Sequence, residues 1–544
     1  MRIAFPPGPH ADRARSFPCR RRTLSRTFAG ARTFAGGRLL LAALVLAPGL
    51  AGCVVGPDYA PPPMAMPAQF AAASKAQTTH PAQLQSWWRR LNDPLLDRLV
   101  SEAVEGNLDV ATAKAKIRQA RATRAEQASA LFPTVTGSGS ITRQQNATTG
   151  SSGTETITVD TAGVSGTSTP YTQWTGGFDA SWELDLFGAN QRSLEAAQRG
   201  VEASQEQLRD TLVTLIGDLT SYYVQARGYQ ARIDLATRTA ASQRETASLT
   251  QRKYDAGSAS AVDVAKATAQ AASTEADIPT LRISYAQAVH RLGILLGREP
   301  AALVAQMRRG APIPAPRLPI ATGAPADILT ARPDVRAAER QLAQATASIG
   351  NAQAQLYPAV SLTGSLATNA LRAGDLAKGS TISWSFGPSL SLPIFNAGNL
   401  QAAVDLSAAQ RDQYYVALKS TVLTALEEVE NALVAVAQER IRASRLSEAA
   451  GAYGNAARLA RAQYQAGSTT FLDVLDAERS LYTAQDSLLQ SRVLIATDYI
   501  ALHKALGGGW DGAVNSSKPE VIDVNTGPHL PPAPALSALS GKED

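Results

Sequence analysis

Two aspartates late in the chain, Asp473 and Asp476, have a type and a spacing that could do electrostatic work. They are three residues apart and follow a Gly-Ser turn at Gly467, so a helix starting there would carry both on one face. Carboxylates that lie close together raise each other's pKa and attract cations. Alternatively, an acid here only stabilises a helix N-terminus. The matching positions in the first half are Asp263 and Lys266, so helix stabilisation explains Asp473 better than Asp476.

The chain has no recognisable catalytic motif. Its five histidines show no metal-ligand spacing, and we find no nucleophile elbow, phosphate-binding loop or dinucleotide-binding motif. We therefore expect a protein that is not an enzyme and that needs neither a cofactor nor a metal ion.

A cysteine at position 53 follows a segment typical of an export signal. Residues 1–52 hold nine arginines and one acid, and they end in an apolar run and Leu50-Ala51-Gly52. The run is about twelve residues long, whereas crossing a bilayer needs roughly 20. We expect a lipoprotein signal peptide at 1–52 and lipidation of Cys53; an ordinary signal that happens to precede a cysteine is the alternative. Removal of residues 1–52 leaves the rest of the chain with a net charge of about +6 − 8 = −2, which does not favour nucleic-acid binding.

The remaining chain is one unit built twice. Residues 252–267 match 462–477 at an offset of 210, and 109–133 match 334–358 at an offset of 225. The change of offset predicts a loop of different length between the two matches. We expect the following order: an N-terminal lipid-anchored segment at 53–91, a first repeat at 92–298, a Pro-rich linker at 299–324, a second repeat at 325–507 and a flexible tail at 508–544.

Each repeat contains a pair of segments with the period of a β-strand. In 174–186 and 382–394 the even positions are mostly apolar and the odd ones hydroxylic or acidic, and 135–141 and 360–366 are shorter partners. The length of about ten residues suits a transmembrane barrel strand, although a soluble sandwich alternates in the same way. Four strands cannot close a barrel, which needs about 8, and lipid does not tolerate open edges. The sequence therefore predicts an oligomer.

Two stretches of the chain predict very long helices. Prolines are absent from 171–278 and from 394–518, and both stretches are rich in helix-forming residues. Helices at about 188–254 and 397–464 would each reach roughly 100 Å. Their apolar stripes are narrow and rich in alanine, as in coiled coils, and much of their surface is polar. A hollow assembly, wet inside and outside, fits this pattern better than a solid bundle.

Several motifs now coincide. They are the start Cys53–Tyr59, Trp87-Trp88 before Asn92-Asp93-Pro94, two Leu-Phe/Tyr-Pro helix ends, two Tyr-x-Ala-Gly-Ser turns and the ending Leu506–Trp510. Together they resemble the TolC-like outer-membrane factor family, in its OprM/NodT-type efflux lipoprotein branch, over nearly the whole mature chain. The resemblance implies a mixed α and β membrane protein: a trimeric 12-stranded β-barrel, with four strands per chain, continued by a long periplasmic α-helical barrel.

The resemblance also implies function and partners. The protein would be the outer-membrane channel of a tripartite efflux pump, a passive exit duct for drugs or toxic small molecules. Its partners would be two further copies of itself, a periplasmic adaptor, an inner-membrane RND-type antiporter and outer-membrane lipid. Val54 is not the aspartate of an inner-membrane retention signal, so lipid anchoring in the outer membrane is expected. A duct for protein secretion and a periplasmic lipoprotein without a pore are the alternatives.

The family pattern assigns roles to residues near the two turns. Asp473 and Asp476 fall on the positions of gate aspartates, and Tyr464 and Asp263 match two positions that close the tip. A basic partner of that aspartate is replaced by Thr469, so a tyrosine–carboxylate hydrogen bond is the most that remains, and simple packing of Tyr464 is the alternative. The turns would face the adaptor, or they are only tight turns; their residues are Gly257, Ser258, Gly467 and Ser468.

Overall fold

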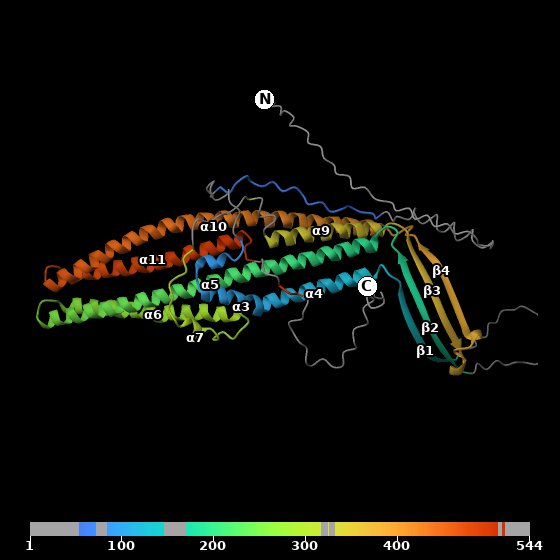
Figure 1. Ribbon diagram of the computed structural model, residues 1–544, viewed down its shortest axis with the longest axis horizontal. Helices are drawn as coiled ribbons and strands as arrows, with labels where there is room; N and C mark the ends of the chain where they lie inside the picture. Colours follow the sequence, from blue (N-terminus) through green and yellow to red (C-terminus); the bar gives the residue numbers. More distant parts are fainter. Residues whose placement is uncertain are drawn as a thin grey trace, which may run out of the picture. The chain divides into compact units, whose positions relative to one another are not determined.

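The computed structural model describes residues 54–71, 84–145, 170–316, 325, 332–509 and 514–516. These residues belong to one unit, Gly52–Asp544. The expected signal peptide and Cys53 lie outside the described residues. The elements, drawn in Figure 1, are η2 (Trp87–Leu91), α3 (Pro94–Gly106), α4 (Leu108–Ser129), β1 (Thr134–Gln144), β2 (Tyr171–Leu184), α5 (Ala189–Asp255), α6 (Ala261–Leu295), α7 (Val304–Met307), α9 (Pro333–Ala354), β3 (Ala359–Ala370), η4 (Ala373–Asp375), η5 (Gly379–Thr381), β4 (Ile382–Ser391), α10 (Asn399–Ala466) and α11 (Phe471–Ala505).

The two very long helices are confirmed. Helix α5 has 67 residues and α10 has 68, and each begins after a glycine in the left-handed region, Gly188 or Gly398. The helices that follow them, α6 and α11, have 35 residues each, and those that precede the strands, α4 and α9, have 22 each. The same elements thus occur in the same order, with nearly the same lengths, in both halves of the chain.

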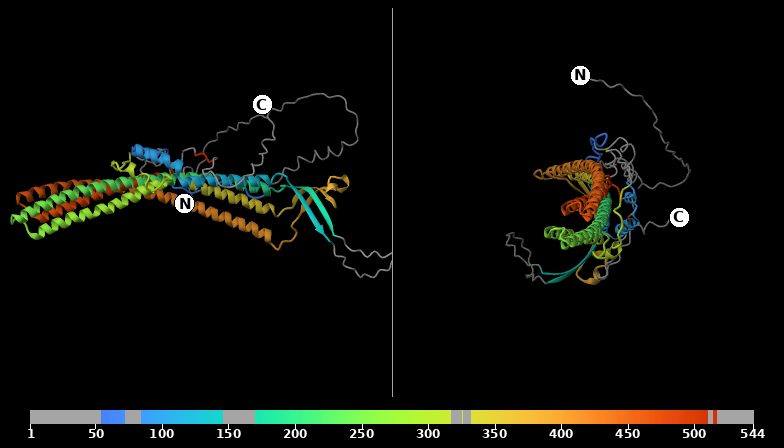
Figure 2. Two further views of the ribbon diagram at one scale, coloured as in Figure 1. Left: turned by 90° about the horizontal axis from the view of Figure 1, so that it is seen from below. Right: turned by 90° about the vertical axis from the view of Figure 1, so that its left-hand side faces the viewer.

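The long helices pack side by side in a fixed order. Helices α9 and α11 lie between α5 and α10, while α4 and α6 lie on the other side of α5 (Figure 1). Seen from one end, the helices follow an arc (Figure 2, right). Among the described helices of this arrangement, α10 lies at one edge and α4 with α6 at the other.

The start of α4 meets the end of α6, and the start of α9 meets the end of α11. The residues that make these two junctions occupy matching positions in the two halves of the chain. Asn107 caps the start of α4, and its side-chain amide donates to the carbonyl of Leu295 at the end of α6 (2.9 Å). In the second half Arg332 precedes α9 and donates to the carbonyl of Ala505 at the end of α11 (2.8 Å). These bonds satisfy terminal carbonyls that have no partner within their own helix. Arg332 is buried and is neutralised by Asp334 and Glu428.

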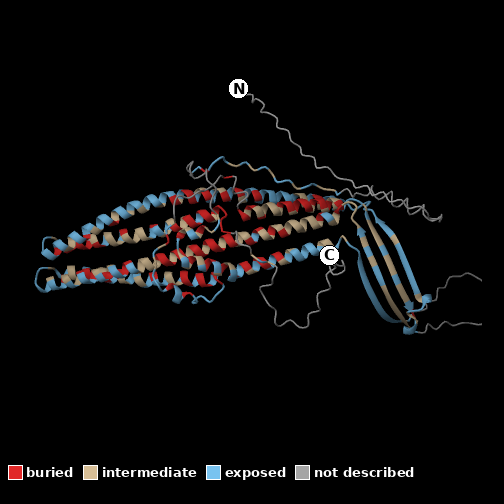
Figure 3. Ribbon diagram, in the orientation of Figure 1, coloured by how far each residue is buried: buried red, intermediate tan, exposed pale blue. Residues whose placement is uncertain are grey.

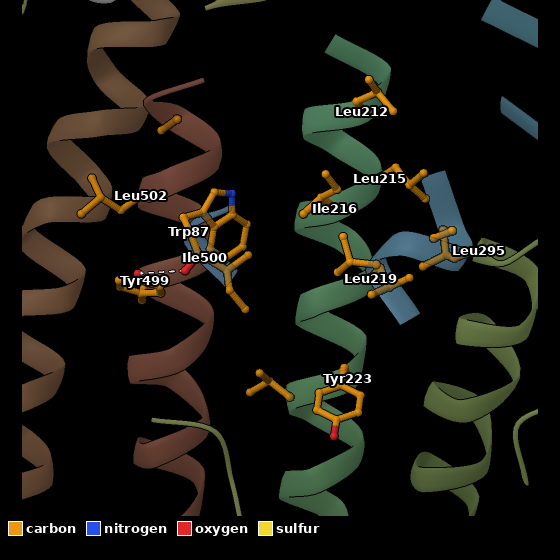
Figure 4. Packing of buried hydrophobic residues seen from close by; sticks show 14 of the residues in the cluster. Trp87, Leu212, Leu215, Ile216, Leu219, Tyr223, Leu295, Tyr499, Ile500 and Leu502 are labelled. Carbon is orange, nitrogen blue, oxygen red and sulfur yellow. Dashed lines mark hydrogen bonds between the residues drawn. The ribbon is translucent and has the colours of Figure 1, made fainter. Parts of the chain in front are cut away.

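The main core lies where these junctions meet the long helices. Figure 3 shows that buried residues concentrate there and are sparse in the sheet. Figure 4 shows Trp87 beside Tyr499, whose hydroxyl donates to the Trp87 carbonyl at 3.4 Å. The Trp87 ring also stacks on His503 at 5.3 Å. Gly508 and Val514 pack into the same region, so the predicted flexible tail does not begin at residue 508.

The four strands form one antiparallel sheet in the order β1-β2-β3-β4. All four strands differ from their predicted bounds. Strands β1 and β3 continue past residues 141 and 366, to Gln144 and Ala370. Strand β2 starts three residues earlier than expected, at Tyr171, and ends at Leu184. Strand β4 ends at Ser391 rather than at residue 394, because its partner β3 begins at Ala359, which lies opposite Ser391.

The register places apolar side chains on one face of the sheet. Phe178 is opposite Leu366, which is in turn opposite Trp384, whereas the neighbouring row pairs Asp179 with Ser365. The apolar face has no cover among the described residues: the Trp384 side chain is 77% exposed and that of Val135 is 68% exposed. The predicted alternation is therefore confirmed, and the apolar face is not packed as it would be in a soluble sandwich.

None of the described helices is long and apolar enough to cross a membrane.

Candidate functional site: the tip of the helical hairpins

Two glycine turns join the long helices to the shorter ones that follow. Gly257 has φ +72° and Gly467 has φ +78°, so both glycines adopt the left-handed conformation. In each turn the serine N–H donates five residues back, from Ser258 to the Lys253 carbonyl (2.7 Å) and from Ser468 to the Gln463 carbonyl (2.9 Å). This is the hydrogen bonding of a Schellman motif, which ends a helix sharply.

Each turn is followed by a capping box built on an aspartate. Asp473 accepts hydrogen bonds from the Thr470 N–H (3.1 Å) and from the Thr470 and Thr469 hydroxyls (2.7 and 2.6 Å). Asp263 accepts in the same way from the Ser260 N–H (3.1 Å) and hydroxyl (2.8 Å). The hydrogen bonds from Thr469 and Thr470 lower the pKa of Asp473. Within one chain, Asp473 therefore has the helix-capping role that was the alternative interpretation.

Asp476 differs from Asp473 in its surroundings. Its side chain is exposed on the same helix, α11, and it has no hydrogen-bond or ion-pair partner among the described residues. A carboxylate in this position is free to face other charges or cations. Nothing in the local helix chemistry requires an acid there.

Tyr464 lies in a small buried cluster with Phe471, Val474 and Leu475 from α11 and Ala267 from α6. Its hydroxyl donates to the Thr250 hydroxyl (3.3 Å), and the Lys253 ammonium lies 4.9 Å from its ring centre. The structure does not show the predicted bond to Asp263, whose carboxylate is held by Ser260. A link between Tyr464 and Asp263 stays a prediction, and packing accounts for Tyr464 within one chain.

Sequence reasoning missed a buried carboxylate next to this cluster. Glu478 is 4% exposed and accepts from the Arg461 Nε (2.6 Å) and the Thr246 hydroxyl (2.9 Å). It thereby joins α11 to α10 and to α5. A cleft of about 210 Å³ lies beside it, lined by residues that include Arg461, Tyr464 and Thr246. The available signal was an acid one turn after Val474 on the packed face of α11.

Two more polar contacts connect the hairpins further from the tip. Arg232 on α5 forms a bidentate ion pair with Asp486 on α11, from Nε to Oδ1 at 2.6 Å and from Nη2 to Oδ2 at 3.1 Å. The Tyr482 hydroxyl on α11 donates to Asp277 on α6 (3.2 Å). Between the main core and the tip cluster, the first hairpin (α5 and α6) is therefore tied to the second (α10 and α11) partly by charged and hydroxyl groups that water can replace.

These features define a class of protein that combines an uncovered amphipathic sheet with long helical hairpins. The sequence profile described as "Outer membrane efflux protein" matches residues 99–298 and 324–508. The chain is 36% identical to Nodulation protein T of Rhizobium leguminosarum bv. trifolii over 464 residues, which cover 85% of this chain and 96% of that protein. It is 33% identical to the probable efflux pump outer membrane protein TtgC of Pseudomonas putida over 482 residues, 87% of this chain and 96% of that protein.

Among solved structures, the outer-membrane channel OprN superposes with a TM-score of 0.76 at 35% identity, over 84% of this chain and 100% of that one. The chain therefore belongs to the outer membrane efflux protein family, as the resemblance in sequence indicated.

Proposed function

We propose that this chain is the outer-membrane channel of an efflux pump, a passive exit duct for drugs or toxic small molecules. The single observation that carries the proposal is the uncovered apolar face of the four-stranded sheet, joined to helices of about 100 Å. The sheet suits a lipid boundary, and the helices are long enough to line a path away from the membrane. The relatives named as efflux pump outer membrane proteins support this function.

The working form is a trimer in this proposal. Strands β1 and β4 are the two edges of the sheet, and their free N–H and C=O groups cannot face lipid. Three copies would supply 12 strands, enough to close a barrel. A stripe along α10 supports a neighbouring copy at the helical edge: its side chains are at least half exposed and recur after about whole numbers of turns, at Val416, Leu423, Val434, Ile441 and Leu459.

The remaining roles follow from the family. The tip turns would contact a periplasmic adaptor, and an inner-membrane RND-type antiporter would supply the energy. Asp473 and Asp476 of three copies would ring the narrow end as a cation-sensitive gate, with the exposed Asp476 as the freer of the two. Lipidation of Cys53 after removal of residues 1–52 would anchor the protein in the outer membrane. The two sets of matching elements support two repeats within 92–298 and 325–507, joined by the linker 299–324.

Two measurements test this function. Purified protein reconstituted in planar bilayers should conduct ions, and its deletion should sensitise cells to small toxic compounds. A protein that neither conducts nor alters susceptibility would contradict the proposal. Loss of a secreted protein without any change in susceptibility would point to a protein-secretion duct instead.

A further inference from the structure

The residues that follow position 53 are bound tightly to the point where the sheet meets the helices. The Val55 N–H donates to the Phe187 carbonyl (3.2 Å), between β2 and α5. Val54 touches Gly188 so closely that a Cβ on this glycine would lie 2.8 Å from the valine side chain. We call residues 54–71 the strap.

One buried arginine on α5 holds the start of the strap. Arg192 is 5% exposed, and its Nε donates to the Val55 carbonyl at 3.1 Å. One terminal nitrogen donates to the Gly56 carbonyl (3.2 Å) and to the Asp58 carboxylate (2.8 Å), while the other donates to Glu195 (2.7 Å). Two carboxylates thus balance the buried charge, and lysine could not reproduce the fork of donors.

The strap crosses α9 at a pair of glycines. A Cβ on Gly56 would lie 2.3 Å from the Cα of Gly350, and Gly56 also has φ +99°. A Cβ on Gly350 would lie 2.9 Å from the side chain of Arg192. Any larger residue at either position would push the strap away from the arginine.

The far end of the strap is fixed in the main core. The Tyr59 hydroxyl donates to Glu339 on α9 (3.2 Å), Phe70 is fully buried, and the Ala71 N–H donates to Glu430 on α10 (2.6 Å). The strap is therefore held at both ends. Its contacts account for each residue of the Val55–Tyr59 motif except Pro57.

We infer that Arg192 is a positioning residue: by clamping the strap at the sheet–helix junction, it fixes the place from which an N-terminal group meets a lipid surface. This inference rests on the proposed anchoring at Cys53. Without the Arg192 contacts, a group attached just before Val54 would be tethered to the next fixed residue, Tyr59, by about six residues, a flexible span of roughly 13 Å. Its effective concentration at the membrane beside the sheet would fall accordingly.

Proteolysis tests the clamp itself. Chymotrypsin should cut after Tyr59 at least about tenfold faster in Arg192→Ala and in Gly56→Ala than in the parent protein. Arg238→Ala is the matched control, because Arg238 is an exposed arginine of the same helix that pairs with Asp234. Cleavage at the parent rate in both variants would overturn the clamp.

Spacers test what the clamp is for. A Gly-Ser insert of about six residues before Val54 lengthens the segment between residue 53 and the Arg192 contacts. The same insert between Pro61 and Pro62 lies on the C-terminal side of those contacts and leaves that segment unchanged. The first insert should slow assembly of protease-resistant protein in the outer membrane about tenfold, and the second less than twofold. Equal slowing by the two inserts would overturn the positioning role. Labelling of the parent with palmitate tests the anchor separately, because its absence would defeat lipidation while leaving the proteolysis result intact.

Discussion

The ion pair between Arg232 and Asp486 offers the sharpest perturbation of the contact between the two helical hairpins. Asp486→Asn keeps the size of the side chain but removes its charge and turns one acceptor into a donor that faces the guanidinium. Both partners are mostly buried, with 24% and 18% of their side chains exposed. The change therefore disrupts a link between α5 and α11 without emptying any space in the core.

The magnitude follows from that burial. Removing one partner of a fully buried pair costs about 3–5 kcal/mol, whereas exposed pairs contribute about 0–1 kcal/mol. For a pair with this exposure we expect about 1–2 kcal/mol. If that energy favours the associated hairpins, the fraction of channels with separated hairpins should rise about 5- to 30-fold.

Single-channel recording measures this fraction directly. Asp486→Asn should raise the open probability, Arg232→Gln should do the same, and the double variant should add little, because the two residues share one interaction. Asp234→Asn is the matched control, since Asp234 forms an exposed ion pair within α5. An open probability for Asp486→Asn equal to that of the control, or fully additive single effects, would refute the reasoning.

Three further outcomes are expected. Asp473→Ala combined with Asp476→Ala should weaken the block of single-channel current by multivalent cations, and unchanged block would count against a gate. Tyr464→Phe should increase leakage of large antibiotics into cells if the hydroxyl helps to close the tip; equal permeability would assign the residue to packing. Burial lowers the pKa of His503 from 6.5 to about 3, so the folded protein disfavours protonation of this residue. The free energy of unfolding therefore decreases as the pH falls from 6.5 towards 3, by about 2 kcal/mol at pH 5. His503→Phe should remove that loss in thermal unfolding at pH 7.5 and 5, whereas His290→Gln, at an exposed site, should not.

The sequence predicted the fold well where the signal was local. The stretches without proline gave the long helices to within two residues, and alternation gave both faces of the sheet. The strand ends were less certain, because alternation continues past the point where hydrogen bonding stops. At β4 the pattern runs on to Ile394, although the ladder with β3 stops at the pair of Ala359 and Ser391.

The site was harder to predict because its contacts join distant parts of the chain. The preference for acids at a helix N-terminus explained the capping roles of Asp263 and Asp473, whose hydrogen-bond partners are close in sequence. The partner of Asp486 is 254 residues away, and that of Tyr464 is 214 residues away. No periodic pattern specifies such pairs, since they depend on how helices from the two halves are packed. The same holds for the strap. Its motif could be recognised in the sequence, but Arg192, the residue that binds it, could not.

Cross-linking between the edge strands tests most directly whether copies of this sheet complete one barrel. Thr136→Cys on β1 should be combined in turn with Ser383→Cys, Ser385→Cys and Ser389→Cys on β4. Asp179→Cys with Ser365→Cys is the control, because these residues are opposite each other within one chain and can link only internally. We predict that at least one edge pair gives covalent trimers and no larger species in oxidised membranes, while the control stays monomeric. Monomers from every edge pair, or ladders beyond three, would contradict the account.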